Sequence, residues 1–210
     1  MRLFDRGRRG SATAHTGERG QSLVEFAVIF PLFWMCVIAL IEFSFIFNAV
    51  LTISSASRNA AVIAAEAADS STADCSILQS VEGDFDAPTF PNQIQKVDIY
   101  WTDDNGARVS GAITTYTRTT SSSISCNVNG NAFTVPYTLT TNGYPASARC
   151  STRSGCVPSS ANNNVNHPGL DTVGVDITYK YLYKTPYSAV LGGSGLTLDR
   201  ASEMRVEPFQ

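Results

Sequence analysis

The feature that most constrains this chain is a long apolar run, Phe26–Phe47, in which Glu42 is the single charged residue. As a helix, its roughly 22 residues are long enough to cross the hydrocarbon core of a membrane, which is about 30 Å thick. Pro31 removes one backbone donor inside this helix and is expected to kink or loosen it. The run therefore predicts one transmembrane helix.

A basic and polar leader, residues 1–20, precedes the run. It carries five arginines and two acidic residues, a charge of +3, which leaves −6 for the remainder of a chain with a net charge of −3. The leader has no apolar segment of its own and is expected to be disordered. By the positive-inside rule, its arginines place residues 1–20 in the cytoplasm and the C-terminal bulk outside the cytoplasmic (inner) membrane.

A processing site is expected between the leader and the helix. A secretory signal places its apolar core ahead of the cleavage site, whereas here the apolar core follows Gly20, so that the helix would survive cleavage. An uncleaved signal anchor fits the same hydropathy, and only the residues around Gly20 argue against it.

The helical pattern continues beyond the apolar run. Small and apolar residues recur at steps of three and four on one helix face: Ile53, Ala56, Ala60, Ile63 and Ala67. The pattern predicts one helix from about Ser22 to about Ala68, whose alanines would let another helix or a sheet approach closely. Asp69–Thr72 interrupts it, and a short helix is expected over Asp74–Val81.

The second half of the chain alternates apolar and polar residues with the period of two that is typical of strands. Strands are expected over Val97–Trp101, Thr114–Thr120, Phe133–Thr140, Val173–Tyr183 and Leu196–Val206. Asn105-Gly106 indicates a hairpin. Two polar stretches, Ser121–Asn131 and Ser159–Asn166, are expected to be loops.

These elements predict an α+β fold, in which a long N-terminal transmembrane and extracytoplasmic helix packs on or leads into an antiparallel β-sheet. The expected parts are a cleaved leader over residues 1–20, the helix over residues 21–68 and an extracytoplasmic α+β domain over residues 69–210.

Cys36 lies inside the apolar run, and the other four cysteines lie beyond it. Four cysteines on one side of a membrane indicate an oxidising compartment and two disulfides, with three pairings open. Cys150–Cys156, which closes a tight loop, is the preferred pair, and it leaves Cys75–Cys126 to tie the end of the helical part to the domain. Zinc is disfavoured because its sites use closely spaced cysteine pairs, and no metal or cofactor is expected.

Composition and motifs give little support to catalysis or nucleic-acid binding. The acidic part beyond the leader lacks the basic surface that nucleic acids require. The two histidines are His15, in the leader, and His167, beside a proline in a polar loop, and no serine has the nucleophile-elbow pattern. The chain is therefore not expected to be an enzyme.

Two carboxylates accompany the apolar helix, where a charge in lipid costs about 3 kcal/mol. Glu25 lies either at the headgroup level, favoured by the dipole of the helix N-terminus, or against a partner in an assembly. Glu42 lies about 25 Å further along the helix, near the outer interface. It is either a solvated acid or a residue used in packing or assembly.

The residues around the leader boundary resemble a known family. Gly20 followed by Gln-Ser-Leu-Val-Glu-Phe resembles the processing site of type IV prepilins, and the wider pattern resembles TadE-like minor pilins or pseudopilins of tight-adherence (Flp, type IVb) pili. The matching positions extend to about Ala68 and return in the last strand. They are Arg19–Ala27, Pro31, Ile41–Phe43, Arg58 and Ala201–Pro208.

The resemblance implies a pilin-like fold and cleavage between Gly20 and Gln21 by a prepilin peptidase, a membrane aspartyl protease. Glu25 would become the fifth residue of the mature chain and pair with the N-terminal amine of a neighbouring subunit. Implied partners are the peptidase, other pilin and pseudopilin subunits, the inner-membrane assembly machinery and membrane lipid. The residues implied in assembly or helix pairing are Glu25, Phe26, Pro31 and Glu42.

The sequence therefore predicts a non-enzymatic structural subunit: a processed minor pilin or pseudopilin that supports assembly or function of a tight-adherence pilus, in the inner membrane or at the cell surface. A bulky C-terminal domain favours a minor subunit, because such a domain is hard to stack in a thin filament. The alternative is a membrane-tethered extracytoplasmic domain for binding or adhesion that is never polymerised.

Overall fold

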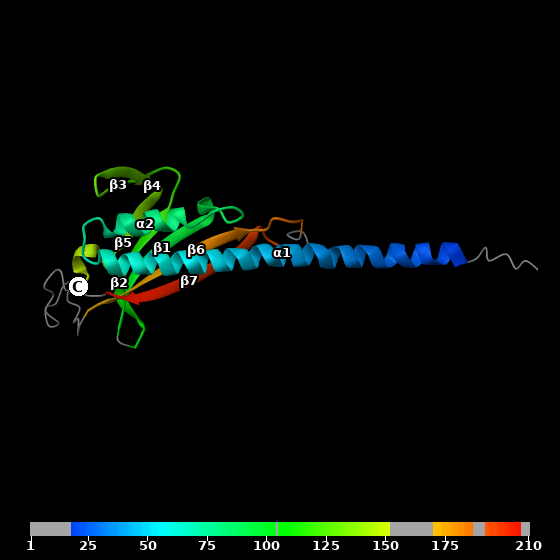
Figure 1. Cartoon of the computed structure of the whole chain (residues 1–210), viewed down its shortest axis with the longest axis horizontal. Coiled ribbons are helices and arrows are strands. Elements are labelled where there is room, and N and C mark those ends of the chain that lie inside the picture. The colour runs from blue at the N-terminus through cyan, green and yellow to red at the C-terminus, as the bar shows by residue number, and fades with distance from the viewer. Residues whose placement is uncertain (1–17, 104, 152–169, 187–191, 207–210) are drawn as a thin grey trace, which may run out of the picture. The chain divides into compact units, whose positions relative to one another are not determined.

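The computed structural model describes residues 18–103, 105–151, 170–186 and 192–206. The chain divides into two compact units, residues 1–41 and residues 42–210, which are described separately below as unit 1 and unit 2. A long N-terminal apolar helix and an antiparallel sheet make up the α+β arrangement that the sequence predicts, so the fold class is confirmed (Figure 1).

The elements begin with a 50-residue helix, α1 (Glu18–Ala67), and a short helix, α2 (Ala73–Gly83). The strands follow in the order β1 (Ile94–Thr102), β2 (Arg108–Arg118), β3 (Ile124–Val128), β4 (Asn131–Val135), β5 (Tyr137–Asn142), β6 (Thr172–Leu182) and β7 (Gly195–Arg205). Two single 3-10 turns, Pro91–Gln93 and Ala146–Ala148, lie ahead of β1 and after β5.

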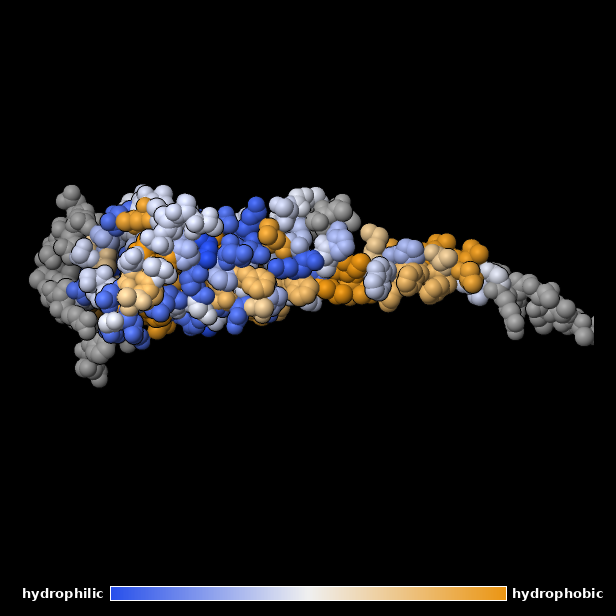
Figure 2. Space-filling view, turned by 90° about the horizontal axis from the view of Figure 1, so that it is seen from above, coloured by the Kyte–Doolittle hydropathy of each residue, from blue (hydrophilic) through white to orange (hydrophobic). Residues whose placement is uncertain are grey.

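Unit 1 consists, in its described part, of the first half of α1. Its bulky apolar side chains are exposed around the helix, including Leu23, Phe26 and Phe33. Figure 2 shows these side chains as an orange stretch along the helix. Among the described residues, α1 has the length and apolar composition needed to cross a membrane. A soluble fold buries such side chains, so the exposed stretch indicates a single-pass membrane protein.

Unit 2 begins with the second half of α1, which packs on the sheet through small residues. Ala56, Ala60 and Ala64 are fully buried, and the hydroxyl of Ser57 donates a hydrogen bond of 2.8 Å to the carbonyl of Val175 in β6. A helix can approach a sheet this closely because alanine side chains hold the two backbones only a short distance apart. Figure 1 shows α2 beside this part of α1.

The main sheet of unit 2 has the strand order β5-β2-β1-β6-β7, and every neighbouring pair is antiparallel. At its centre Val97 and Ile99 of β1 lie opposite Ile177 and Val175 of β6, and all four are fully buried. β7 forms one edge and is exposed along most of its length. The core therefore lies between the central strands and the alanine-rich face of α1.

The predicted hairpin at Asn105-Gly106 joins β1 to β2 and is confirmed. One oxygen of Asp103 accepts hydrogen bonds from the backbone N–H groups of Asn105 (2.9 Å) and Ala107 (2.8 Å). The bond from Ala107 is the main reason that the pKa of Asp103 lies below its usual value. Gly106 has a φ of +76°, which glycine adopts without steric cost.

The predicted bounds differ from the structure most clearly for α1 and for one strand. α1 begins at Glu18, four residues before the expected start. The segment predicted as the strand Phe133–Thr140 is divided between β4 and β5, because Pro136 lacks a backbone N–H and separates two strands that belong to different sheets.

The loop prediction for Ser121–Asn131 is wrong, because β3 lies within it and pairs with β4. The serine and asparagine content of this stretch hides a strand whose one fully buried side chain is Cys126. The other predicted loop, Ser159–Asn166, falls outside the described residues.

Candidate functional site

Gly20, at the predicted cleavage point, is exposed within the first turn of α1. A Cβ added there would meet no atom within 4 Å. A glycine in a helix interior costs about 1 kcal/mol relative to alanine, so the fold has no need of this one. Of Gln21 the structure describes the helical backbone alone.

Glu25 and Phe26 lie on the exposed surface of α1 in unit 1. Phe26 begins a row of aromatic side chains at four-residue steps, with ring centroids 5.3 Å from Phe26 to Phe30 and 6.3 Å from Phe30 to Trp34. Pro31 lies inside α1, whose helical assignment continues through it. These positions therefore present a helix surface that is apolar except for the carboxylate of Glu25.

Glu42, in contrast, is buried within unit 2 with 2% of its surface exposed. Its carboxylate accepts hydrogen bonds from the Tyr181 hydroxyl (2.6 Å), the Lys184 backbone N–H (3.1 Å), and both the backbone N–H (2.8 Å) and hydroxyl (2.6 Å) of Thr185. Burial, together with the bond to Glu42, raises the pKa of Tyr181 above its usual value.

The geometry at Glu42 favours the packing interpretation over the solvated acid. Four donors from the end of β6 and the segment after it satisfy the carboxylate, which makes a buried charge tolerable. The residue therefore fastens α1 to the sheet of its own chain. A sequence pattern cannot reveal this, because the donors lie about 140 residues away and two of them are backbone groups.

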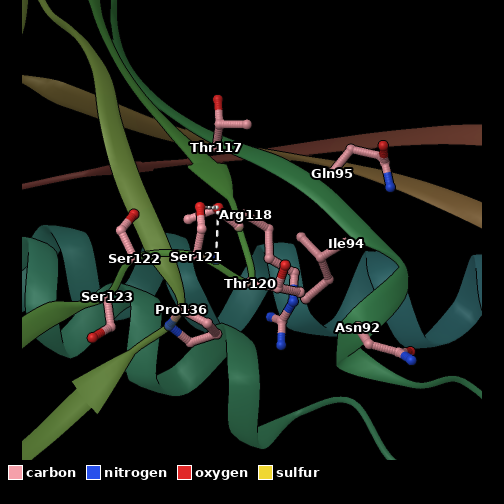
Figure 3. A pocket seen from close by; sticks show the side chains of 11 residues that line it. Asn92, Ile94, Gln95, Thr117, Arg118, Thr120, Ser121, Ser122, Ser123 and Pro136 are labelled. Carbon is pink, nitrogen blue, oxygen red and sulfur yellow. Dashed lines mark hydrogen bonds between the residues drawn. The ribbon is translucent and has the colours of Figure 1, made fainter.

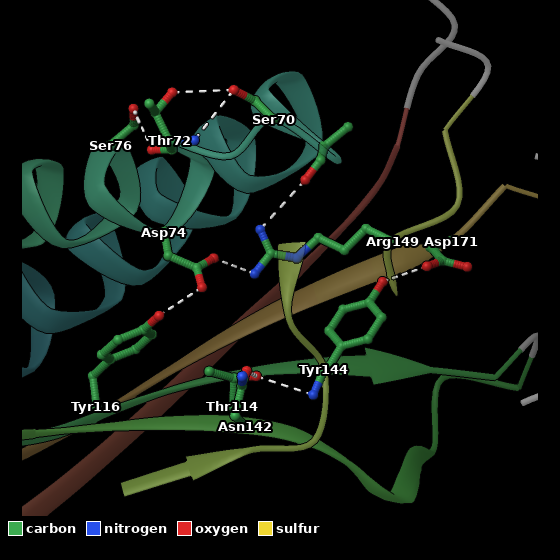
Figure 4. Close-up of polar contacts among 11 residues, drawn as sticks. Ser70, Thr72, Asp74, Ser76, Thr114, Tyr116, Asn142, Tyr144, Arg149 and Asp171 are labelled. Atoms are coloured by element: carbon green, nitrogen blue, oxygen red, sulfur yellow. Dashed lines mark hydrogen bonds and ion pairs between the residues drawn. The ribbon is translucent and has the colours of Figure 1, made fainter. Parts of the chain in front are cut away.

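A second polar cluster, which the sequence analysis missed, centres on Arg149 (Figure 4). This side chain is fully buried and forms an ion pair with Asp74 at the start of α2. It also donates a hydrogen bond of 3.4 Å to the carbonyl of Ala68, which follows the end of α1. The Tyr116 hydroxyl donates a hydrogen bond of 2.6 Å to the other carboxylate oxygen of Asp74. The cluster joins the ends of both helices to β2.

Next to it, the Tyr144 ring lies 5.5 Å from the Arg149 guanidinium, and the Tyr144 hydroxyl donates a hydrogen bond to Asp171. Burial first, and the Asp171 charge second, raise the pKa of Tyr144 well above its usual value. The Tyr144–Asp171 hydrogen bond and the Arg149–Asp74 ion pair each join segments that are far apart in the chain, which is a structural role.

A cavity of about 770 Å³ opens beside the end of β2 (Figure 3). Hydroxyl and amide side chains dominate its lining, and its one charged group, Arg118, forms an ion pair with Glu82. Within the described residues no group of three His, Cys, Asp or Glu side chains could hold a metal ion. The two histidines of the chain, His15 and His167, fall outside those residues. The lining offers many hydrogen-bond donors and acceptors.

A disulfide joins Cys75 of α2 to Cys126 of β3, the pair that the sequence analysis leaves for these two residues. It attaches the two-stranded sheet β3–β4 covalently to the helical layer. Cys36 is a free and exposed thiol on α1. Cys156 falls outside the described residues, so the Cys150–Cys156 pairing stays a prediction.

Among the described residues, an exposed apolar helix and a folded antiparallel α+β unit indicate a single-pass membrane protein. Within that class, residues 20–62 match the family model of TadE-like proteins, which confirms the resemblance over this part of the chain. This family is associated with tight-adherence pili and is structural in character. No curated protein and no solved structure matches the chain.

The family match covers much of α1, including Glu25 and Glu42, and no residue of the sheet. The part of the chain that matches the family model is thus the helix.

Proposed function

We propose that the protein is a minor pilin or pseudopilin of a tight-adherence pilus, processed by a prepilin peptidase between Gly20 and Gln21. The observation that carries the proposal is the match to TadE-like proteins, which begins at Gly20 itself. The basic leader lies in the cytoplasm, and unit 2 lies outside the membrane, where the Cys75–Cys126 disulfide can form.

The role of Gly20 is recognition by the peptidase. The space around Gly20 would accept an alanine, so the fold itself gives no reason for a glycine there. A protease reads an extended substrate, and glycine weakens the helix at the bond to be cut.

Glu25 acts between subunits. A carboxylate at this depth is costly alone in lipid, and an N-terminal amine created by cleavage is costly as well. Pairing the two from neighbouring chains offsets both costs if hydrogen bonds satisfy the remaining groups. Phe26 and Pro31 lie on the same helix and shape the surface that packs against the neighbour.

The size of unit 2 favours a minor subunit of the pilus over the major one. An α+β domain of this size at the end of one helix fits a tip, a base or a priming complex better than the wall of a thin filament. The ion pairs Arg118–Glu82 and Arg149–Asp74 hold its own elements together.

Mass spectrometry of the mature chain tests the proposal. In cells that contain the peptidase, we expect a chain that begins at Gln21, and we expect Gly20→Ala to accumulate uncut but folded protein. Glu25→Gln keeps the size of the side chain and should allow cleavage while reducing pilus assembly. A native chain that retains Met1 in such cells would instead support a tethered domain that is never polymerised.

A further inference from the structure

Seven large apolar side chains are exposed among the described residues of unit 2, and five of them gather at the end where the chain enters the unit. We call these five residues the apolar pole: Phe43, Phe47, Phe90, Leu182 and Leu196. Leu51 continues the row on α1, and Leu139 lies on β5, the strand at the far edge of the sheet from β7.

Contacts around Glu42 bring the pole together from four separate segments. Tyr181, which donates to Glu42, lies opposite Leu196 in the β6–β7 pair, and Leu182 follows it in the chain. The Lys184 ammonium lies 5.2 Å from the centroid of the Phe90 ring. The Thr89 hydroxyl donates a hydrogen bond of 3.3 Å to the side-chain oxygen of Asn48 in α1.

The position of this pole along the chain points to its partner. Residues 22–41 number about 20, which as a helix matches the roughly 30 Å of the hydrocarbon core. Glu42 is the next residue and is already buried in unit 2, so the hydrocarbon must end beside the pole. This shortens the span predicted over Phe26–Phe47, because the last residues of that run belong to unit 2.

The chemistry of the pole fits a lipid headgroup layer. Each polar layer of a bilayer is about 5–8 Å thick, and Phe47 lies about 7.5 Å along the helix beyond Glu42. Transfer of aromatic and aliphatic side chains from water to this layer is favourable in free energy. The ammonium of Lys184, above the Phe90 ring, can bind lipid phosphates there. The Glu42 carboxylate, which lipid phosphates would repel, is held inside by four donors.

We propose that the apolar pole seats unit 2 in the outer headgroup layer of the membrane, so that lipid is the partner of this surface. The inference rests on the single-pass anchoring and not on pilus assembly. Unit 2 is then held to the bilayer by a second contact besides its helix, and entering a filament requires that this contact be exchanged for one with protein.

Spin-label accessibility in vesicles tests this surface. The full chain, with Cys36→Ser to remove the free thiol, receives one new cysteine by Phe90→Cys or by Leu139→Cys. These positions are matched, since their side chains are 45% and 43% exposed. Each labelled protein is reconstituted into phosphatidylcholine–phosphatidylglycerol vesicles at a low and a high protein-to-lipid ratio. Collisions with oxygen, which concentrates in lipid, are compared with collisions with a water-soluble nickel chelate.

We expect the label at position 90 to have a several-fold higher ratio of oxygen to nickel collisions than the label at position 139, at both protein-to-lipid ratios. Equal ratios at the two positions in dilute vesicles would show a pole in water and overturn the proposal. Protection of position 90 from both reagents, increasing with protein concentration, would assign the pole to a second copy of the chain. Cleavage at Gly20 can be measured separately on the same cells, so a failure here leaves the proposed processing untouched.

Discussion

The two halves of α1 have the same backbone and opposite side-chain chemistry. In unit 1 the helix carries exposed phenylalanine, leucine and tryptophan, whereas in unit 2 its inner face is a row of buried alanines. Bulky side chains suit a lipid environment, which adapts to their shape, and small ones suit a sheet, which does not. The size of the residues along one helix thus records what each half lies against.

The two carboxylates differ in the same way. Glu25 is exposed on the helix of unit 1, and Glu42 is enclosed by donors of its own chain. A carboxylate can be kept near lipid either by a partner chain or by an intrachain set of donors. The hydrogen bonds of Glu42 are an example of the second solution, and the function proposed above uses the first for Glu25.

High pH should unfold unit 2 and spare unit 1, which is the largest effect we expect. All eight tyrosines lie in unit 2. Burial raises the pKa of Tyr100 to about 12 and raises the pKa of Tyr116 and Tyr137 further. Because the folded pKa values exceed the usual value of 10, stability is complete below pH 10 and falls as the pH rises beyond it.

The two tryptophans report the two units, since Trp34 lies in unit 1 and Trp101 in unit 2. In detergent micelles, Trp34→Phe leaves Trp101 as the probe, and Trp101→Phe leaves Trp34. We expect the Trp101 signal to change cooperatively above pH 10 while the Trp34 signal stays constant. Ionisation of all tyrosines near pH 10 with an unchanged Trp101 signal would contradict the expectation.

Glu42→Ala should lower the free energy of unfolding of unit 2 by about 3 kcal/mol, because the hydroxyls of Tyr181 and Thr185 and two backbone N–H groups lose their acceptor. Urea unfolding followed by Trp101 fluorescence measures it. Glu25→Ala is the matched control and should change this free energy by less than about 0.5 kcal/mol. Similar losses from the two variants would remove the distinction between the carboxylates.

An added leucine side chain should distinguish the helix halves directly. Ala56→Leu forces a larger side chain against the sheet and should destabilise unit 2 by about 2 kcal/mol, whereas Ala27→Leu adds an apolar group to an exposed surface. The same urea titration compares the two variants. If Ala56→Leu proved neutral, the close approach of helix and sheet would be wrong.

The smallest expected effect comes from the hydrogen bond that the Ser57 hydroxyl of α1 donates to β6. Ser57→Ala removes the donor to the Val175 carbonyl and should cost about 1 kcal/mol. Ser55→Ala, an exposed neighbour on the same helix, provides the control and should be neutral within error. If the two variants had the same free energy of unfolding, Ser57 would lie outside the packed interface.

Periodicity was sufficient to predict the helix, the main-sheet strands β1, β2, β6 and β7 and the α+β class, because each depends on apolar spacing within a short window. It merged β5 with β4, because the apolar pattern runs through Pro136. β3 was missed because a short strand with one fully buried residue has no such spacing. The contacts of Glu42 and Arg149 were beyond reach for another reason: their partners are far away in the chain, and several are backbone groups whose direction depends on the finished fold.

The exposed edge strand β7 could cause neighbouring copies of the chain to aggregate in a crowded membrane. Anchored chains face one another at high local concentration, and an unpaired strand edge invites the sheet of one copy to continue into the next. β7 carries Asp199, Arg200, Glu203 and Arg205, and two copies would have to bring these charges together out of water. The charges of β7 therefore protect it against aggregation. Association of subunits then depends on the helix and not on the edge of the sheet.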